Sequence, residues 1–379
     1  MVRILHFVSS PEIGSGVMTV IMNYYRNIDR KRFHFDFLCF IKPEAEKSYQ
    51  REIEALGGTV YYIPKPSISS LPKLRKFFQK YAGTYDWLHN HEVYLTWLLR
   101  PLSKANGIEH FIVHCHATKY SDRRLAALRN RLLCLPIRYM KGIYRFACSK
   151  AAGNFLYGKR CMRQRNVFIM YNAINAQDYA FDAEGRKRVR STLGYTDKDI
   201  VLGNVGRFVP QKNQIFLLEL LATLQKLNTN TTYKLLLIGE GPLEENLKSY
   251  AKSLGVYEQI CFYGRSKDMQ QMLSAMDVFL LPSVFEGLPM SLVEAQANGL
   301  VCIIGEAVTQ EALLSKTAKR LPFTVRAWEK ALQPVKARNT EEPDDATVKK
   351  MEQNAAFDIR KAVRRLERVY DKNRRVDIL

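Results

Sequence analysis

Short apolar runs rich in β-branched and aromatic residues alternate with stretches of helical spacing along most of this chain. In the first half these runs are 4–8, 35–40, 60–63, 87–89, 111–114, 146–148 and 167–170. A polar stretch, 175–198, interrupts the pattern, which restarts at 200–203, 234–238, 260–263, 278–281 and 301–304. Strands that alternate with helices build parallel sheets covered by helices. The sequence therefore predicts two α/β domains, followed by a helical segment near the end.

The composition agrees with two soluble domains. A chain of 379 residues with 47% hydrophobic residues can bury two cores. Its longer apolar stretches are too short to cross a bilayer, and Glu219 interrupts one of them, 215–224. The apolar start of the chain has no small-residue cleavage site after it, so we interpret it as a buried strand. The seven cysteines form no C-x-x-C pair, which favours reduced thiols in the cytoplasm.

The net charge of +21 calls for acidic partners: nucleic acid, anionic lipid or phosphorylated small molecules. Residues 117–165 hold thirteen basic side chains against the single acid Asp122, so over half of the excess lies in one segment. No nucleic-acid-binding module is recognisable. A basic protein that binds nucleic acid or other anions remains the alternative from another functional class.

The segment 285–295 follows a predicted strand and opens a helix, with Pro289 suited to its first turn. The start of such a helix faces the carboxyl edge of the sheet, where N–H groups and the helix dipole favour a phosphate. Glu286 lies in the entering loop and Glu294 within the helix, where a carboxylate can accept hydrogen bonds from a ribose diol. The alternative is a capped helix with solvated acids.

A second loop, 205–213, follows the first predicted strand of the second domain and carries Arg207 and Lys212. Arginine makes planar bidentate contacts and lysine supplies a mobile point charge, which together suit a diphosphate. Taken alone, this loop could equally be a surface loop with two ordinary cations. Its position at the same sheet edge as the 285–295 segment favours an anion site.

With these motifs in place, the chain resembles glycosyltransferase family 4, a group of retaining enzymes, and among them the capsule and exopolysaccharide transferases. Further matching segments are Gly14-Ser15-Gly16, 114–118, 147–152, 172–175 and Gly239-Glu240-Gly241. The resemblance implies the GT-B fold, in which two Rossmann-like domains face each other across a cleft. It implies an acceptor-binding domain over 1–178, a donor-binding domain over 179–350, and a closing helix over 351–379 that packs back toward the first domain.

The resemblance also implies roles for individual residues. Arg207 and Lys212 would hold the donor diphosphate, Glu294 the ribose and Glu286 the transferred sugar. Further donor contacts would come from the residues Gly16, Gly264, Arg265, Gly287, Leu288, Pro289 and Met290. Gly16 would let the backbone approach the diphosphate because it has no Cβ. The catalytic set implied is His116, Glu286, Arg207 and Lys212.

All seven histidines lie in the first half of the chain. His114 and His116 alternate along a predicted strand, so their side chains should point to opposite faces unless the strand has ended. His116 matches the family's active-site histidine and is preferred over His114. His89 and His91 are candidates for the acceptor side. We do not expect a His-Cys-His metal site around Cys115, because adjacent positions on a strand diverge.

No metal or cofactor is expected in the reaction. The family's D-x-D metal signature occurs only as Asp197-Lys198-Asp199, at the start of a predicted strand and away from the expected site. The cations and the helix dipole would then neutralise the leaving diphosphate.

The segment 124–138 is a candidate membrane contact. Arg124, Arg131 and Arg138 recur every seven residues, which keeps them near one face of a helix. Four leucines lie beside them: Leu125, Leu128, Leu132 and Leu135. Such a helix can lie on an anionic bilayer, but it can equally be a domain helix whose leucines face the sheet.

The function implied is transfer of a hexose from a UDP-sugar to a saccharide acceptor, expected to be lipid-linked, in surface polysaccharide synthesis. The enzyme would act in the cytoplasm, peripherally on the inner face of the membrane. The alternative enzyme is an epimerase or phosphorylase on the same fold. Either would need a different carboxylate and histidine set, or a cofactor lysine.

Overall fold

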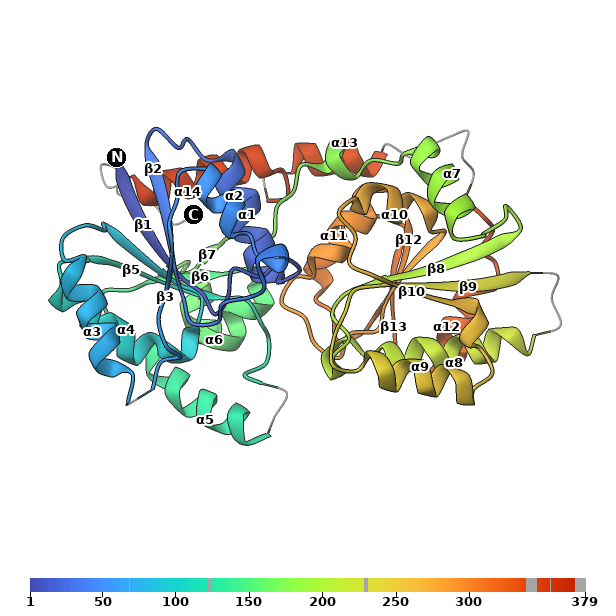
Figure 1. Cartoon of the computed structure of the whole chain (residues 1–379), viewed down its shortest axis with the longest axis horizontal. Coiled ribbons are helices and arrows are strands. Elements are labelled where there is room, and N and C mark those ends of the chain that lie inside the picture. Colours follow the sequence, from blue (N-terminus) through green and yellow to red (C-terminus); the bar gives the residue numbers. More distant parts are fainter. Residues whose placement is uncertain (68, 122–123, 228–230, 339–345, 355, 372–379) are drawn as a thin grey trace. The chain divides into compact units, whose positions relative to one another are not determined.

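The computed structural model of the chain describes residues 1–67, 69–121, 124–227, 231–338, 346–354 and 356–371. It divides into two compact units, each described here by itself. Unit 1 comprises Met1–Ala173 with Ile359–Leu379, and unit 2 comprises Ile174–Asp358. Each unit contains one parallel sheet with helices on both sides (Figure 1). Among the described residues, no helix is both long enough and apolar enough to span a membrane.

Unit 1 has a seven-stranded sheet in the order β3-β2-β1-β4-β5-β6-β7. Its strands are β1 Val2–Phe7, β2 Phe33–Cys39, β3 Val60–Tyr62, β4 Trp87–Asn90, β5 His110–Cys115, β6 Tyr144–Ala147 and β7 Phe168–Ile169. Its helices are α1 Gly16–Asn27, α2 Gln50–Ala55, α3 Leu71–Lys80, α4 Thr96–Ala105, α5 Arg124–Cys134, α6 Lys150–Arg163 and α14 Ile359–Tyr370. The strand order reverses between β1 and β4. In such sheets ligands bind at the carboxyl ends of the strands, at this reversal.

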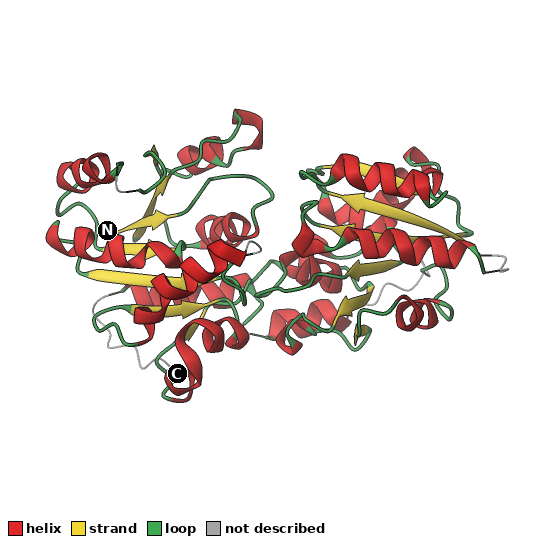
Figure 2. Ribbon diagram, turned by 90° about the horizontal axis from the view of Figure 1, so that it is seen from below, coloured by secondary structure: helices red, strands yellow, loops and turns green. Residues whose placement is uncertain are grey.

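Unit 2 has a six-stranded sheet in the order β10-β9-β8-β11-β12-β13. Its strands are β8 Asp199–Val205, β9 Thr232–Ile238, β10 Ile260–Gly264, β11 Val278–Leu281, β12 Val301–Gly305 and β13 Ala318–Leu321. Its helices are α7 Ala183–Thr192, α8 Gln214–Gln225, α9 Glu244–Ser253, α10 Met269–Ala275, α11 Met290–Ala297, α12 Val325–Leu332 and α13 Ala346–Gln353. Here the order reverses between β8 and β11, which makes their carboxyl ends the expected ligand edge. Figure 2 shows strands and helices of both units from a second direction.

The prediction of two parallel α/β domains is confirmed. All twelve strands predicted from the apolar runs are present, with ends shifted by at most two residues. One further strand, β13, lies at the edge of the second sheet and was not predicted. Its four residues, Ala-Lys-Arg-Leu, include two exposed basic residues, so they show no apolar run.

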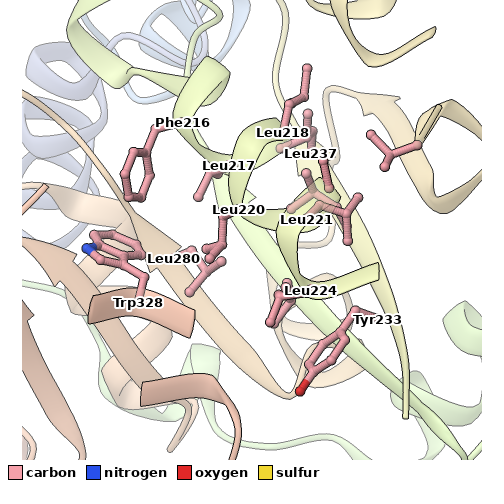
Figure 3. Packing of buried hydrophobic residues seen from close by; sticks show 14 of the residues in the cluster. Phe216, Leu217, Leu218, Leu220, Leu221, Leu224, Tyr233, Leu237, Leu280 and Trp328 are labelled. Atoms are coloured by element: carbon pink, nitrogen blue, oxygen red, sulfur yellow. The ribbon is translucent and has the colours of Figure 1, made fainter. Parts of the chain in front are cut away.

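The core of unit 2 is built around α8, which is buried on almost all sides. Leu217, Leu220 and Leu224 lie against the sheet, and Phe216 packs edge-on against Trp328 of α12, with ring centroids 5.0 Å apart (Figure 3). Burial of most of its side chains explains why 215–224 is so apolar, although Ile215 is 43% exposed. Helix α8 is covered by β9, α9 and α12.

The last described segment forms two helices where the sequence analysis expected one. Helix α13 ends at Gln353 and belongs to unit 2, whereas α14 belongs to unit 1. The buried face of α14 has helical spacing and consists of Ile359, Ala362, Val363, Leu366, Val369 and Tyr370. Helix α14 packs against α1, and the carbonyl of Tyr370 accepts a hydrogen bond from Trp87 Nε1 at 3.3 Å. Residues 372–379 of the expected closing helix lie outside the described residues.

Candidate functional site

The loop after β8 presents the first two predicted site residues. Arg207 is exposed, and Lys212 closes a 3₁₀ turn, Pro210–Lys212. A Cβ on Gly206 would lie 3.3 Å from Cδ and Cε of Lys212, so glycine lets the lysine stem pass close to the backbone. Asn213 then adopts a left-handed conformation, with φ of 54°, and α8 begins. The side chain of Lys212 therefore lies close to the backbone of its own loop, at Gly206.

Lys212 forms an ion pair with Glu286, which lies in the loop after β11. Lys212 Nζ is 2.7 Å from Glu286 Oε1, and the two side chains are 18% and 9% exposed. Two hydrogen bonds involving Gln211 join the same loops: its carbonyl accepts from Val284 N at 2.9 Å, and its Nε2 donates to Phe285 O at 3.0 Å. The two loops that flank the reversal of the sheet are thus held together.

Helix α11 starts beside this pair. Pro289 is its N-cap residue, and Gly287 and Leu288 form the approach to its first turn. The first N–H groups of any helix have no partner within the helix and, with its dipole, favour an anion. Glu294 lies in the second turn and is buried. Burial raises the pKa of the Glu294 carboxyl to about 7, and a hydrogen bond with the Tyr179 side chain opposes part of the shift.

Gly264 and Arg265 lie at the end of β10, at the same edge of the sheet. Gly264 has a φ of +77°, and its carbonyl accepts a hydrogen bond from Gly239 N at 2.8 Å. Arg265 Nε donates to Glu240 Oε2 at 3.1 Å. A Cβ on Gly239 would collide with the carbonyl of Gly206, so this glycine lets the turn after β9 pack against the loop after β8. Glu240, for which the sequence predicted no role, thus lies beside the predicted donor residue Arg265.

The D-x-D segment lies at the opposite edge of this sheet. Asp199 is the first residue of β8 and is buried, and its Oδ2 accepts hydrogen bonds from the amide and hydroxyl of Thr196 at 2.6 and 2.9 Å. Asp199 therefore closes the turn that starts the strand.

In unit 1, Gly16 opens α1 directly after the loop that follows β1. A Cβ built on Gly16 would meet no atom within 4 Å, and Gly16 does not have a positive φ. An alanine there would fit the fold without strain.

His116 lies one residue beyond the end of β5. The rings of His114 and His116 have centroids 3.9 Å apart, so the side chains do not diverge as expected for alternating strand positions. The strand ends at Cys115, and the chain turns there. The Cys115 thiol donates to the carbonyl of Ala117 at 3.2 Å. Burial lowers the pKa of His116 to about 3.

His114 and His116 belong to a larger group at the carboxyl ends of β1, β4 and β5. We call this group the histidine cluster: His6, His89, His91, His114 and His116. Three pairs of ring nitrogens lie within hydrogen-bond distance, at 3.0 Å for His6–His91, 3.1 Å for His89–His114 and 2.8 Å for His91–His116. Burial lowers the pKa of every member, so the rings are neutral at pH 7. A histidine near the end of each of three neighbouring strands was the sequence signal for this cluster.

The predicted membrane segment is divided in the structure. Helix α5 ends at Cys134, and Pro136 lies in a 3₁₀ turn, Leu135–Arg138. Arg124 and Arg131 are exposed, whereas Arg138 donates hydrogen bonds to the carbonyls of Phe155 and Leu156, both at 3.0 Å. The four leucines do not pack on the sheet: Leu125, Leu128, Leu132 and Leu135 are 85%, 57%, 63% and 50% exposed.

Comparison with known proteins agrees with this architecture. The family described as "Glycosyl transferases group 1" matches residues 186–336, which include every predicted donor residue of unit 2. EpsF of Bacillus subtilis (strain 168), which carries the name of a glycosyltransferase, is 30% identical over 318 residues, 82% of this chain and 80% of EpsF. The chain belongs to the group 1 glycosyltransferases.

Two further relatives and one solved structure resemble this glycosyltransferase. The UDP-Gal:alpha-D-GlcNAc-diphosphoundecaprenol alpha-1,3-galactosyltransferase of Escherichia coli is 22% identical, covering 80% of this chain and 79% of that enzyme. The capsular polysaccharide biosynthesis glycosyltransferase CapH of Staphylococcus aureus is 23% identical, covering 80% and 81%. Anabaena Alr3699/HepE in complex with UDP-glucose has a TM-score of 0.75 at 18% identity, covering 97% and 99%. This likeness establishes the GT-B fold.

Proposed function

We propose that this glycosyltransferase transfers a hexose from a UDP-sugar to a lipid-linked saccharide, with retention of the anomeric configuration, during synthesis of a surface polysaccharide. The observation that carries the proposal is the edge of unit 2 where the Lys212–Glu286 ion pair, the start of α11 and the buried Glu294 meet. The names of the relatives support the donor and the acceptor, because the Escherichia coli relative is named for UDP-Gal and a diphosphoundecaprenol-linked sugar.

In unit 2 we assign a role to each donor contact. Arg207 and Lys212 bind the diphosphate and stabilise the charge that grows as it leaves, together with the N–H groups between Gly287 and Met290. Lys212 also holds Glu286, so the carboxylate keeps one orientation toward the transferred sugar. Glu294 accepts hydrogen bonds from the ribose diol. The bend at Gly264 and Arg265 contacts the nucleobase.

In unit 1 we assign Gly16 to backbone contact with the diphosphate and His116 to the transferred sugar. Both assignments rest on the resemblance to glycosyltransferase family 4 and on the position of these residues after β1 and β5. We place the saccharide acceptor in unit 1 and the donor in unit 2. Transfer is proposed to need no metal ion, because the acids of the D-x-D segment lie at the other edge of the unit 2 sheet.

We further propose that α5 contacts the cytoplasmic face of an anionic membrane. Its exposed leucines and its arginines supply the apolar and the cationic contacts of an amphipathic helix at an interface. In this arrangement the leucines enter the bilayer and Arg124 and Arg131 bind headgroups. Arg138 is left out of the contact, because it is bonded to the backbone of α6.

The proposed reaction can be tested by following nucleotide release across a panel of nucleotide sugars. We expect acceptor-dependent release of UDP from one UDP-hexose, and NMR of the product should show the anomeric configuration of the donor. An inverted product would contradict retention. Interconversion of the donor sugar without UDP release would indicate an epimerase, and sugar 1-phosphate formation from a glycan and phosphate would indicate a phosphorylase. Retention on DNA without sugar-nucleotide turnover would favour the anion-binding alternative.

A further inference from the structure

The histidine cluster in unit 1 holds two groups of three imidazoles whose available nitrogens converge. Within His91, His114 and His116, and within His6, His89 and His91, one nitrogen of each ring lies within 4.8 Å of the others. The second group is buried at all three positions, whereas His116 is partly exposed. A metal site needs an entry path, so the first group is the better candidate.

In His91 and His114, one nitrogen is available to an ion and the other lies within hydrogen-bond distance of a further histidine. His114 Nε2 is buried without a hydrogen-bond partner in the described part of the chain, while its Nδ1 lies 3.1 Å from His89 Nε2. His91 Nδ1 lies 2.8 Å from His116 Nε2, while its Nε2 lies 3.0 Å from His6 Nδ1. The other nitrogen of His89, Nδ1, lies 2.7 Å from the Tyr370 hydroxyl.

This arrangement matches how proteins orient histidine ligands. A histidine that binds a metal with one nitrogen almost always donates the other N–H to a partner, which fixes its tautomer and ring plane. His6 and His89 are placed to be those partners for His91 and His114. Without an ion, at most one proton can lie between His91 Nδ1 and His116 Nε2, and His114 Nε2 has no hydrogen-bond partner among the described residues. A cation at the convergence satisfies all three nitrogens.

We propose that His91, His114 and His116 bind a divalent transition metal ion of the zinc class. Tetrahedral Zn²⁺ with nitrogen at about 2.0–2.1 Å separates its ligands by about 3.3 Å, so the His91–His116 pair needs to open only slightly. Three imidazoles suit Zn²⁺, Co²⁺ or Ni²⁺, whereas Mg²⁺ and Mn²⁺ prefer oxygen ligands. The partly exposed side at His116 leaves a fourth position for water.

A metal ion bound by these three histidines should affect catalysis, an effect that rests on the proposed function. A metal at this site binds Nε2 of His116 and so immobilises the side chain that we assign to the transferred sugar. Zn²⁺ should therefore inhibit transfer, and EDTA should restore it. The three histidines would thus form an inhibitory metal site in unit 1, whereas no metal is proposed for the donor contacts of unit 2.

The test is a Co²⁺ titration of the whole, tag-free, EDTA-stripped protein, followed by visible absorption and calorimetry. We expect one Co²⁺ per chain, d–d bands of a four-coordinate nitrogen and oxygen site, no thiolate-to-cobalt band, and displacement by Zn²⁺ but not by Mg²⁺. His114→Asn removes Nε2 and keeps a polar group at the Nδ1 position, and should abolish the bands. His89→Gln should weaken binding about 10- to 100-fold, because it alters the partner behind His114.

His110→Gln is the matched control, because it removes a histidine from the same strand outside the cluster and should leave binding unchanged. Thermal unfolding of each metal-free variant checks that it folds. A thiolate band, equal binding by wild type and a folded His114→Asn variant, or no binding would each overturn the proposal. None of these measurements requires turnover, so failure of the metal site and failure of the proposed function can be told apart.

Discussion

Lys212 and Glu286 are separated by 74 residues in sequence, yet their charged atoms lie 2.7 Å apart at the point where the unit 2 sheet reverses its strand order. The pair joins the loops after β8 and β11 and leaves both side chains largely buried. Because one partner is assigned to the diphosphate and the other to the sugar, stability and catalysis can be separated by substitution.

We expect Lys212→Met to lower both stability and kcat, because it removes the ion-pair partner of a nearly buried carboxylate as well as a cation from the diphosphate site. The double variant Lys212→Met/Glu286→Gln should regain most of the lost stability, while its kcat stays at least about 100-fold below that of the wild type. Denaturant unfolding and steady-state kinetics measure the two effects. Lys226→Met, at an exposed lysine of the same unit, is the control. Recovery of kcat in the double variant would show that the lysine acts only through the fold.

Arg207→Ala should lower kcat about 100-fold with little loss of stability, because Arg207 is exposed and its charge acts on the leaving diphosphate. Steady-state kinetics and thermal unfolding check this. Unchanged kcat would exclude Arg207 from the reaction.

Glu294 should make donor binding depend on pH. Its carboxyl has a pKa of about 7 in the fold against 4.5 in a model peptide, and only the charged form accepts both ribose hydroxyls. The donor KM should therefore fall as the pH rises through 7. In Glu294→Gln the KM should be higher and independent of pH in this range, with kcat less affected.

The raised pKa of Glu294 affects stability in the opposite direction from donor binding. Between pH 4.5 and 7 the unfolded chain loses this proton while the folded chain keeps it, so the unfolding free energy falls as the pH rises. The loss amounts to about 3 kcal/mol, relative to Glu294→Gln. A pH series of denaturant unfolding on both proteins measures the difference, and parallel curves would contradict the buried, protonated state.

Gly16→Ala should leave the unfolding temperature unchanged, because a Cβ there meets no atom within 4 Å. If the backbone at this position approaches the diphosphate, the added methyl should raise the donor KM about tenfold or more, a loss of at least about 1.4 kcal/mol. Gly14→Ala is not a suitable control, since Gly14 has a φ of +87°. Normal kinetics in a stable Gly16→Ala variant would remove Gly16 from the donor site.

Turnover should survive EDTA, and added Mg²⁺ or Mn²⁺ should not increase it, because the cations of unit 2 and the start of α11 are proposed to neutralise the leaving group. Initial rates with and without chelator test this. Loss of activity in EDTA with recovery on adding Mg²⁺ or Mn²⁺ would refute metal-independent transfer.

The protein should float with vesicles that contain phosphatidylglycerol, and less so as salt rises. Leu125→Ser/Leu128→Ser/Leu132→Ser should remove the apolar contact, and Arg124→Glu/Arg131→Glu should remove about 2 kcal/mol of electrostatic attraction and add repulsion. Lys226→Glu/Lys267→Glu carries the same charge change at two exposed lysines of unit 2 and should still float. Equal flotation of all variants, or equal recovery with neutral vesicles, would show that α5 is not the contact.

Much of this protein could be read from local pattern. Alternating apolar runs and helical stretches determined both sheets, since a parallel strand is buried on both faces and must be apolar whatever its neighbours are. Strand order along the chain also predicted that Lys212 and Glu286 lie at one edge of unit 2, because both follow strands whose carboxyl ends meet there, whereas their roles toward a donor came from the family resemblance. Edge strand β13 could not be predicted from an apolar run, because two of its four residues are exposed and basic.

Tertiary structure decided the features that depend on which residues meet. Whether the leucines of α5 face the sheet or solvent is a question of packing, and the helical spacing is the same in both cases. Arg138 shares the seven-residue spacing of Arg124 and Arg131, yet the turn at Pro136 brings it to the carbonyls of α6. The histidine cluster exists because β1, β4 and β5 are neighbours in the sheet. Strand order is a property of the folded chain, and it brings together side chains that are far apart in sequence.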